Sequence, residues 1–87
     1  MKKVKDLGIE SIIKAVRKSD GLVRYFSISS IYKLDFFILD LKDYSLLAFE
    51  ISEDILERDI NGTELKIIPI GFNSSQEDNY IIYEQEI

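Results

Sequence analysis

The sequence contains no cysteine, no histidine and no tryptophan, and it has one proline and four glycines among its 87 residues. Without cysteine and histidine, it cannot form disulfides, thiolate nucleophiles, zinc sites built on these residues, Ser-His-Asp triads or imidazole general bases. No apolar run approaches the roughly 20 residues that a membrane-spanning helix needs. The basic start, Met1-Lys2-Lys3, is followed by Asp6 before any apolar segment long enough for a signal peptide. We therefore expect a cytoplasmic protein that does not enter membranes.

The composition is that of a folded protein, with 46% hydrophobic and 31% charged residues. Its length suits one compact domain over residues 1–87. The net charge of −5 disfavours direct binding to nucleic acid. Residues 1–24 carry seven basic and three acidic side chains, whereas residues 25–87 carry four basic and thirteen acidic ones. This asymmetry indicates an acidic face for a partner with a basic surface.

The apolar spacing near the N-terminus predicts a helix. Ile9, Ile12, Ile13 and Val16 fall at i, i+3, i+4 and i+7, which places them on one side of a helix over residues 7–18. We expect this amphipathic helix to pack on a sheet.

Several later segments resemble strands. Residues 22–29 alternate with a period of two, as expected for a strand that ends at Ser29-Ser30. Residues 35–41 and 46–51 are apolar runs around a four-residue polar turn, which favours a hairpin. Residues 31–41 also fit one side of a helix, so both interpretations stay open.

The C-terminal half contains a second ambiguous segment. Ser52 precedes an acidic stretch that fits a short helix over residues 53–60, but Asn61-Gly62 is also a strong hairpin signal. Residues 64–70 and 80–87 are further strand candidates, separated by a polar loop.

Together these elements predict an α+β fold: the N-terminal helix packed on a small antiparallel sheet of four to five strands, with a second short helix near residues 53–60. The hairpin is apolar on both faces, unlike a sheet with one wet face. Its second face needs a cover, supplied either by the chain itself or by another chain. The residues of this candidate oligomer face are Phe36, Ile38, Leu46 and Ala48.

No motif names a reaction. The four glycines form neither a phosphate-binding loop nor a dinucleotide-binding loop, and no serine lies in Gly-x-Ser-x-Gly. Acidic residues are dense in the middle of the chain but lack the spacing of a calcium loop. We expect no enzymatic activity, no cofactor and no metal site.

The resulting hypothesis is a non-catalytic protein-binding module. Size and charge alone suggest an inhibitor or regulator that occupies a basic surface, as phage or mobile-element inhibitors and immunity proteins do. One alternative is a subunit that self-associates as a homodimer, and a weaker one is a nucleic-acid-associated regulator that uses the basic first helix. The candidate partner-binding residues are Asp40, Asp43, Tyr44, Glu50, Glu53, Asp54 and Glu57.

Overall fold

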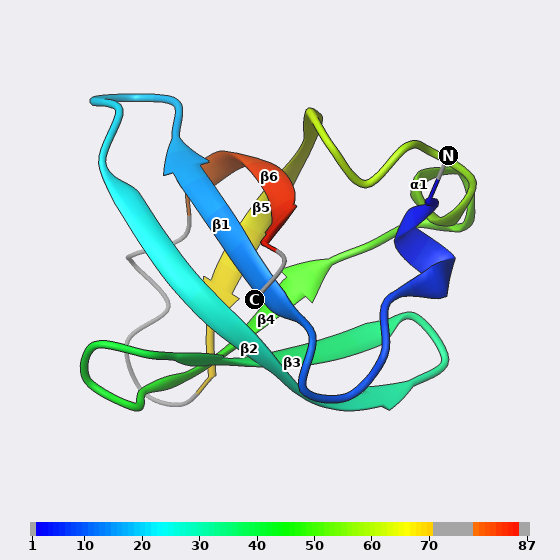
Figure 1. Ribbon diagram of the computed structural model, residues 1–87, viewed down its shortest axis with the longest axis horizontal. Helices are drawn as coiled ribbons and strands as arrows, with labels where there is room; N and C mark the ends of the chain where they lie inside the picture. The colour runs from blue at the N-terminus through cyan, green and yellow to red at the C-terminus, as the bar shows by residue number, and fades with distance from the viewer. Residues whose placement is uncertain (1, 71–77, 86–87) are drawn as a thin grey trace.

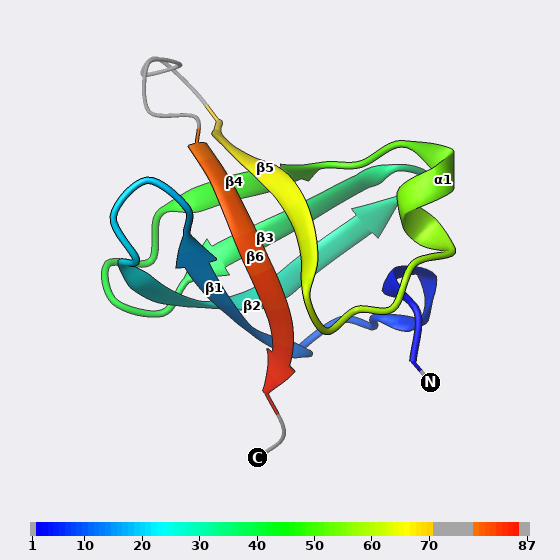
Figure 2. The ribbon, with the colours of Figure 1, turned by 90° about the horizontal axis from the view of Figure 1, so that it is seen from above.

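Six antiparallel strands form a closed barrel in the computed structural model, which describes residues 2–70 and 78–85 (Figure 1). Strands that follow one another in the chain are neighbours in the barrel, and β6 closes it by pairing with β1. The strands are β1 (Ile12–Arg17), β2 (Val23–Tyr32), β3 (Asp35–Asp40), β4 (Leu46–Glu50), β5 (Thr63–Pro69) and β6 (Asp78–Gln85). Two short helical turns, η1 (Val4–Asp6) and α1 (Glu53–Leu56), lie together at one end (Figure 2).

The predicted α+β fold is wrong, because the N-terminal amphipathic helix does not form. Half of the segment assigned to it is β1, in which Ile13 and Ala15 are fully buried and point into the barrel. Ile9, the first residue of the supposed helical stripe, is 57% exposed. Glu10 has a φ of 74°, in the left-handed region, so the chain turns sharply just before the strand. The helical spacing of the isoleucines is therefore a coincidence of loop and strand positions.

Closure of the barrel depends on residues far apart in the sequence. β1 pairs with β6 from Ile12 opposite Gln85 to Arg17 opposite Tyr80. This pairing removes the two free strand edges that an open six-stranded sheet would expose. The prediction of a small antiparallel sheet of four to five strands missed both the sixth strand and this closure.

Alternate residues of all six strands fill the interior. Burying each large apolar side chain contributes about 1.5 to 3 kcal/mol, so these positions supply most of the stability. The buried apolar residues of the strands are Ile13, Ala15, Phe26, Ile28, Phe36, Ile38, Leu47, Phe49, Leu65, Ile67, Tyr80 and Ile82.

The hairpin predicted over residues 35–51 is confirmed as β3 and β4, but its faces differ from the expected ones. Phe36 and Ile38 point into the barrel, at 3% and 0% exposure. Leu46 and Ala48 lie on the outside, because the register places Leu46 opposite Leu39. The four residues of the expected oligomer face therefore lie on opposite faces of the sheet.

The remaining predictions have mixed outcomes. The strand expected to end at Ser29-Ser30 continues to Tyr32 through an irregularity in register between Ile28 and Ser30. The short helix expected over 53–60 forms only as the single turn α1 over its first half, and the rival hairpin does not form. The strands expected over 64–70 and 80–87 correspond to β5 and β6, and residues 71–77 of the predicted polar loop lie outside the described residues. Over the described residues, no helix has the length and apolarity needed to cross a membrane.

Candidate functional site

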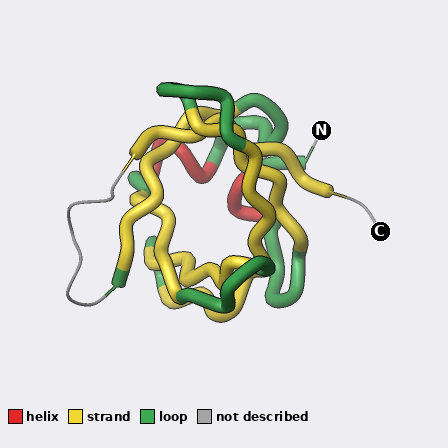
Figure 3. Tube along the Cα trace, turned by 90° about the vertical axis from the view of Figure 1, so that its left-hand side faces the viewer, coloured by secondary structure: helices red, strands yellow, loops and turns green. Residues whose placement is uncertain are grey.

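The two ends of the barrel are closed in different ways. Helical turns η1 and α1 cover one end, which we call the plugged end (Figures 1 and 2). The β1–β2 and β3–β4 connections surround the other end, which we call the mouth. Figure 3 looks into the barrel from the mouth, with the helical turns behind the ring of strands.

A charged pair lies just inside the mouth. Arg24 of β2 contacts Asp40 at the end of β3, with 2.5 Å from Nη2 to Oδ2 and 3.1 Å from Nε to the same oxygen. Arg24 Nη1 also donates to the hydroxyl of Tyr80 at 3.1 Å. The second carboxylate oxygen of Asp40 accepts the backbone N–H of Lys42 at 2.8 Å. Every charged atom at this position therefore has a partner, as burial requires.

This pair is held rigidly. The Asp40 side chain is 6% exposed and that of Arg24 is 25% exposed. Burial lowers the pKa of Arg24, but its hydrogen bonds to Tyr80 and Asp40 outweigh the burial and raise the pKa above its usual value. The guanidinium also lies over the ring of Phe26, 5.1 Å from the centroid. The Arg24–Asp40 pair therefore lies between the barrel interior and the mouth, and we call it the charged floor of the mouth.

Apolar side chains surround this charged floor on the outside. Among the described residues ten large hydrophobic side chains are exposed, and seven of them lie around the mouth at 40% to 71% exposure. We call these seven the mouth surface: Leu22, Val23, Tyr25, Leu41, Tyr44, Leu46 and Ile70. Scattered exposed apolar residues are normal, but a group of them gathered at one end of a molecule is typical of an interaction site.

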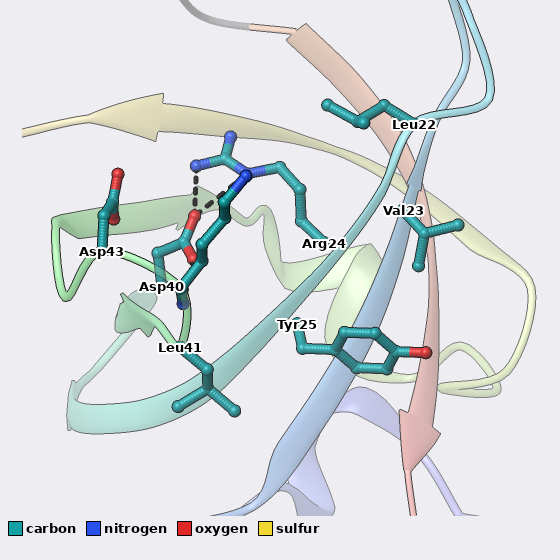
Figure 4. A pocket seen from close by; sticks show the side chains of 8 residues that line it. Leu22, Val23, Arg24, Tyr25, Asp40, Leu41 and Asp43 are labelled. Atoms are coloured by element: carbon teal, nitrogen blue, oxygen red, sulfur yellow. Dashed lines mark hydrogen bonds and ion pairs between the residues drawn. The ribbon is translucent and has the colours of Figure 1, made fainter.

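Two hollows run into the mouth surface. The larger, of about 520 Å³, is lined by residues that include Leu22, Tyr25 and Leu41 and the Arg24–Asp40 pair (Figure 4). The smaller, of about 300 Å³, lies between the β3–β4 turn and the end of β5. Arg24 and Asp43 line both hollows, so the two form one uneven surface.

The β3–β4 turn presents an exposed tyrosine in a strained conformation. Tyr44 is 71% exposed and has a φ of 60°, a backbone region that favours glycine or asparagine. Asp43 stabilises the turn by accepting the backbone N–H and the hydroxyl of Ser45, at 3.0 and 2.7 Å. These hydrogen bonds lower the pKa of Asp43. An exposed, strained tyrosine contributes little to folding, which points to a role in contacts with another molecule.

The structure divides the predicted partner-binding residues between the two ends. Asp40, Asp43 and Tyr44 lie at the mouth, although Asp40 is buried beneath it. The others are at or near the plugged end: Glu50, Glu53, Asp54 and Glu57. They do not form one acidic surface.

Two of the acidic residues at the plugged end are already paired. The Glu57 carboxylate accepts hydrogen bonds from Nζ of Lys3 at 2.9 Å and from Nζ of Lys5 at 3.0 Å, and these hydrogen bonds lower the pKa of Glu57. Asp54 accepts the hydroxyl of Ser52, which lowers the pKa of Asp54, and it pairs with Arg58 at 3.2 Å. These carboxylates mainly tie η1 and α1 together or stabilise α1 itself.

A shallow groove of about 860 Å³ remains at this end, between α1 and the β2–β3 turn. Leu34 and Leu56 supply apolar lining, and Asp35 and Glu53 contribute carboxylates beside Lys33. Glu57 also lines the groove, but its carboxylate is paired with Lys3 and Lys5.

Sequence reasoning missed the importance of Arg24. The alternation of the strand contained the signal. Arg24 lies two residues before the buried Phe26, so its side chain is on the same inward face and places a charge there. Asp40 likewise follows the buried Ile38 by two residues. Two opposite charges in phase with core residues indicate a buried ion pair.

Within residues 2–70 and 78–85, no group of three or more acidic side chains is placed to hold a metal ion. No protein-family model matches the chain, and neither the curated proteins nor the solved structures include a significant match.

Proposed function

We propose that this chain is a small non-catalytic protein-binding module, of the inhibitor or regulator type, that docks onto its partner through the mouth surface. The observation that carries the proposal is the gathering of seven exposed large apolar side chains around the mouth. Removing these side chains from water would favour binding by roughly 25 cal/mol for each Å² of apolar surface buried.

The chemistry of the mouth supports this role. Tyrosine and arginine are enriched at the centres of protein interfaces, and Tyr25, Tyr44 and Arg24 lie within or beside the hollows. The rigid Arg24–Asp40 pair loses little conformational entropy when a partner covers it. The lack of histidine and cysteine throughout the chain agrees with a binding role more readily than with catalysis.

Affinity capture from the native host tests this proposal with a matched pair of variants. Leu41→Glu adds a charge to the mouth surface, and Ile9→Glu adds the same charge to an exposed aliphatic residue elsewhere. We expect a specific protein to be retained by the unmodified chain and by Ile9→Glu but lost with Leu41→Glu. Identical capture by all three chains would contradict the proposal.

The groove at the plugged end favours a second candidate function, binding of a basic segment. Its apolar residues Leu34 and Leu56 lie beside the carboxylates of Asp35 and Glu53, which suits a peptide that carries both aliphatic and cationic side chains. A salt titration with an immobilised basic amphipathic peptide tests it. Binding should weaken as salt rises and with Glu53→Gln, and salt-independent binding would count against this candidate.

A further inference from the structure

We infer that the mouth surface binds a second copy of this chain, so that two barrels associate mouth to mouth around a two-fold axis. The inference rests on the proposed function and names the partner for the same surface. It is argued from the charge balance at the mouth, from the shapes of its parts and from the size of this end.

Charges around the mouth are nearly balanced. Among the described residues Arg17 pairs with Asp20 at 2.6 Å and lies 3.8 Å from Asp78, Lys18 pairs with Glu64 at 2.9 Å, and Arg24 pairs with Asp40 at 2.5 Å. This near balance contrasts with the net charge of −5 for the whole chain. A strongly basic or strongly acidic partner finds little excess of opposite charge here, whereas a surface of the same composition does not need one.

One pair of opposite charges is left over and suits two-fold symmetry. Lys42 and Asp43 are adjacent in the β3–β4 connection, and neither forms a salt bridge with another described residue. In a two-fold interface each residue meets its counterpart's neighbours, so Lys42 of each copy can face Asp43 of the other. Such exposed pairs add little affinity, but they set the orientation in which two apolar surfaces meet.

Shape gives a second reason. Tyr44 projects from its turn with 71% of its surface exposed, and the hollow of about 520 Å³ lies on the same end of the molecule. A two-fold axis that passes between Tyr44 and this hollow places the tyrosine of each copy against the hollow of the other. The walls of that hollow, Leu22, Tyr25 and Leu41, provide apolar contacts for the ring (Figure 4).

The size of this end is adequate for a stable interface. The molecule measures 34 × 27 × 26 Å, and its longest axis runs from the mouth to the plugged end (Figure 1). In the plane of the mouth the molecule is therefore at most about 27 by 26 Å across. Stable interfaces bury about 800 Å² on each partner, so a stable dimer has to use nearly the whole width of this end.

Sedimentation equilibrium of the full chain over a wide concentration range tests the inference. We expect a monomer–dimer equilibrium in the unmodified protein. Leu41→Glu should raise the dissociation constant at least about tenfold, whereas Ile9→Glu, with the same added charge, should leave it unchanged. Lys42→Glu should raise it by about two- to fivefold at low salt and by less at high salt, and Lys33→Glu at the plugged end is its control. Circular dichroism of each variant confirms that the fold is retained.

A monomer at every concentration would overturn the inference, as would a dimer that is insensitive to Leu41→Glu and Lys42→Glu. The proposed function is tested by a different result. If the chain is monomeric but still captures a different host protein through Leu41, the protein-binding function is supported and only the identity of the partner changes.

Discussion

The plugged end and the mouth bury opposite kinds of side chain. At the plugged end Val4 and Ile60 are fully buried, and charged residues such as Lys3 and Glu57 lie outside them. At the mouth, the charged pair Arg24–Asp40 lies inside and apolar residues such as Leu41 lie outside. The first arrangement is that of a folded core and the second is that of a binding surface. The comparison indicates that one end stabilises the barrel and the other makes contacts.

Long-range backbone hydrogen bonds stabilise both ends. At the plugged end Val4 N donates to Arg58 O at 3.0 Å, and Ile60 N donates to Lys2 O at 2.9 Å. At the mouth Lys18 N donates to Asn79 O at 2.9 Å. The two ends therefore differ in their side chains rather than in how the backbone is held.

The largest difference between the two ends should appear on removing apolar side chains. Ile60→Ala leaves a cavity beneath η1 and α1 and should lower the free energy of unfolding by about 2 to 5 kcal/mol. Leu41→Ala removes an exposed side chain and should change it by no more than about 0.5 kcal/mol. Urea unfolding followed by circular dichroism measures both. Equal losses for the two variants would remove the distinction between core and contact surface.

The charged floor of the mouth should respond strongly to the loss of one partner. Arg24→Met leaves the Asp40 carboxylate, 6% exposed, without its cation and should cost about 3 kcal/mol of unfolding free energy. The double variant Arg24→Met with Asp40→Leu should recover most of this loss, because no unpaired charge remains. If the single variant is as stable as the unmodified protein, the pair does not close the barrel.

Tyr44 should separate stability from binding. Asparagine tolerates the left-handed backbone better than tyrosine does, so Tyr44→Asn should raise the free energy of unfolding by about 0.5 to 1 kcal/mol. The same change removes a ring from the mouth surface and should weaken self-association, measured by sedimentation equilibrium. A loss of stability would show that Tyr44 acts in folding instead.

The smallest effects concern pH. Arg17 donates to Asp20 at 2.6 Å and, with the backbone N–H of Leu22, lowers the Asp20 pKa to about 2. At the plugged end, Lys3 and Lys5 lower the pKa of Glu57. Because both pKa values fall on folding, each group stabilises the protein at neutral pH and loses its contribution as pH falls through its folded pKa. Carboxyl-carbon NMR titration should show both midpoints below their ordinary values, and an ordinary midpoint for Asp20 would show that its contact with Arg17 does not persist in solution.

Local patterns in the sequence predicted some elements and not their assembly. The hairpin of β3 and β4 was predictable because a polar turn, Lys42 to Ser45, separates two apolar runs. The short helix α1 was predictable from Ser52 and the acidic residues after it. The faces of the hairpin were not, because register depends on the turn, and a shift of one residue moves every side chain to the other face.

The N-terminal segment shows why the fold class was missed. Ile12, Ile13 and Val16 fit a helix or a strand, and nothing local decides between them. The strand forms because β2 and β6 pair with it on both sides, and β6 is more than sixty residues away in the chain. The mouth surface was equally hidden, since its members come from separate turns and strand ends that meet only in the closed barrel. Tyr44 was identified because its place in a hairpin turn was a local property.

Amide NMR spectra recorded across a concentration series test most directly the claim that the mouth is a contact surface. We predict that the shifts change with concentration at residues 22–25 and 41–46 and stay constant at the plugged end, around α1. Spectra that are independent of concentration, or changes centred on α1, would contradict association through the mouth.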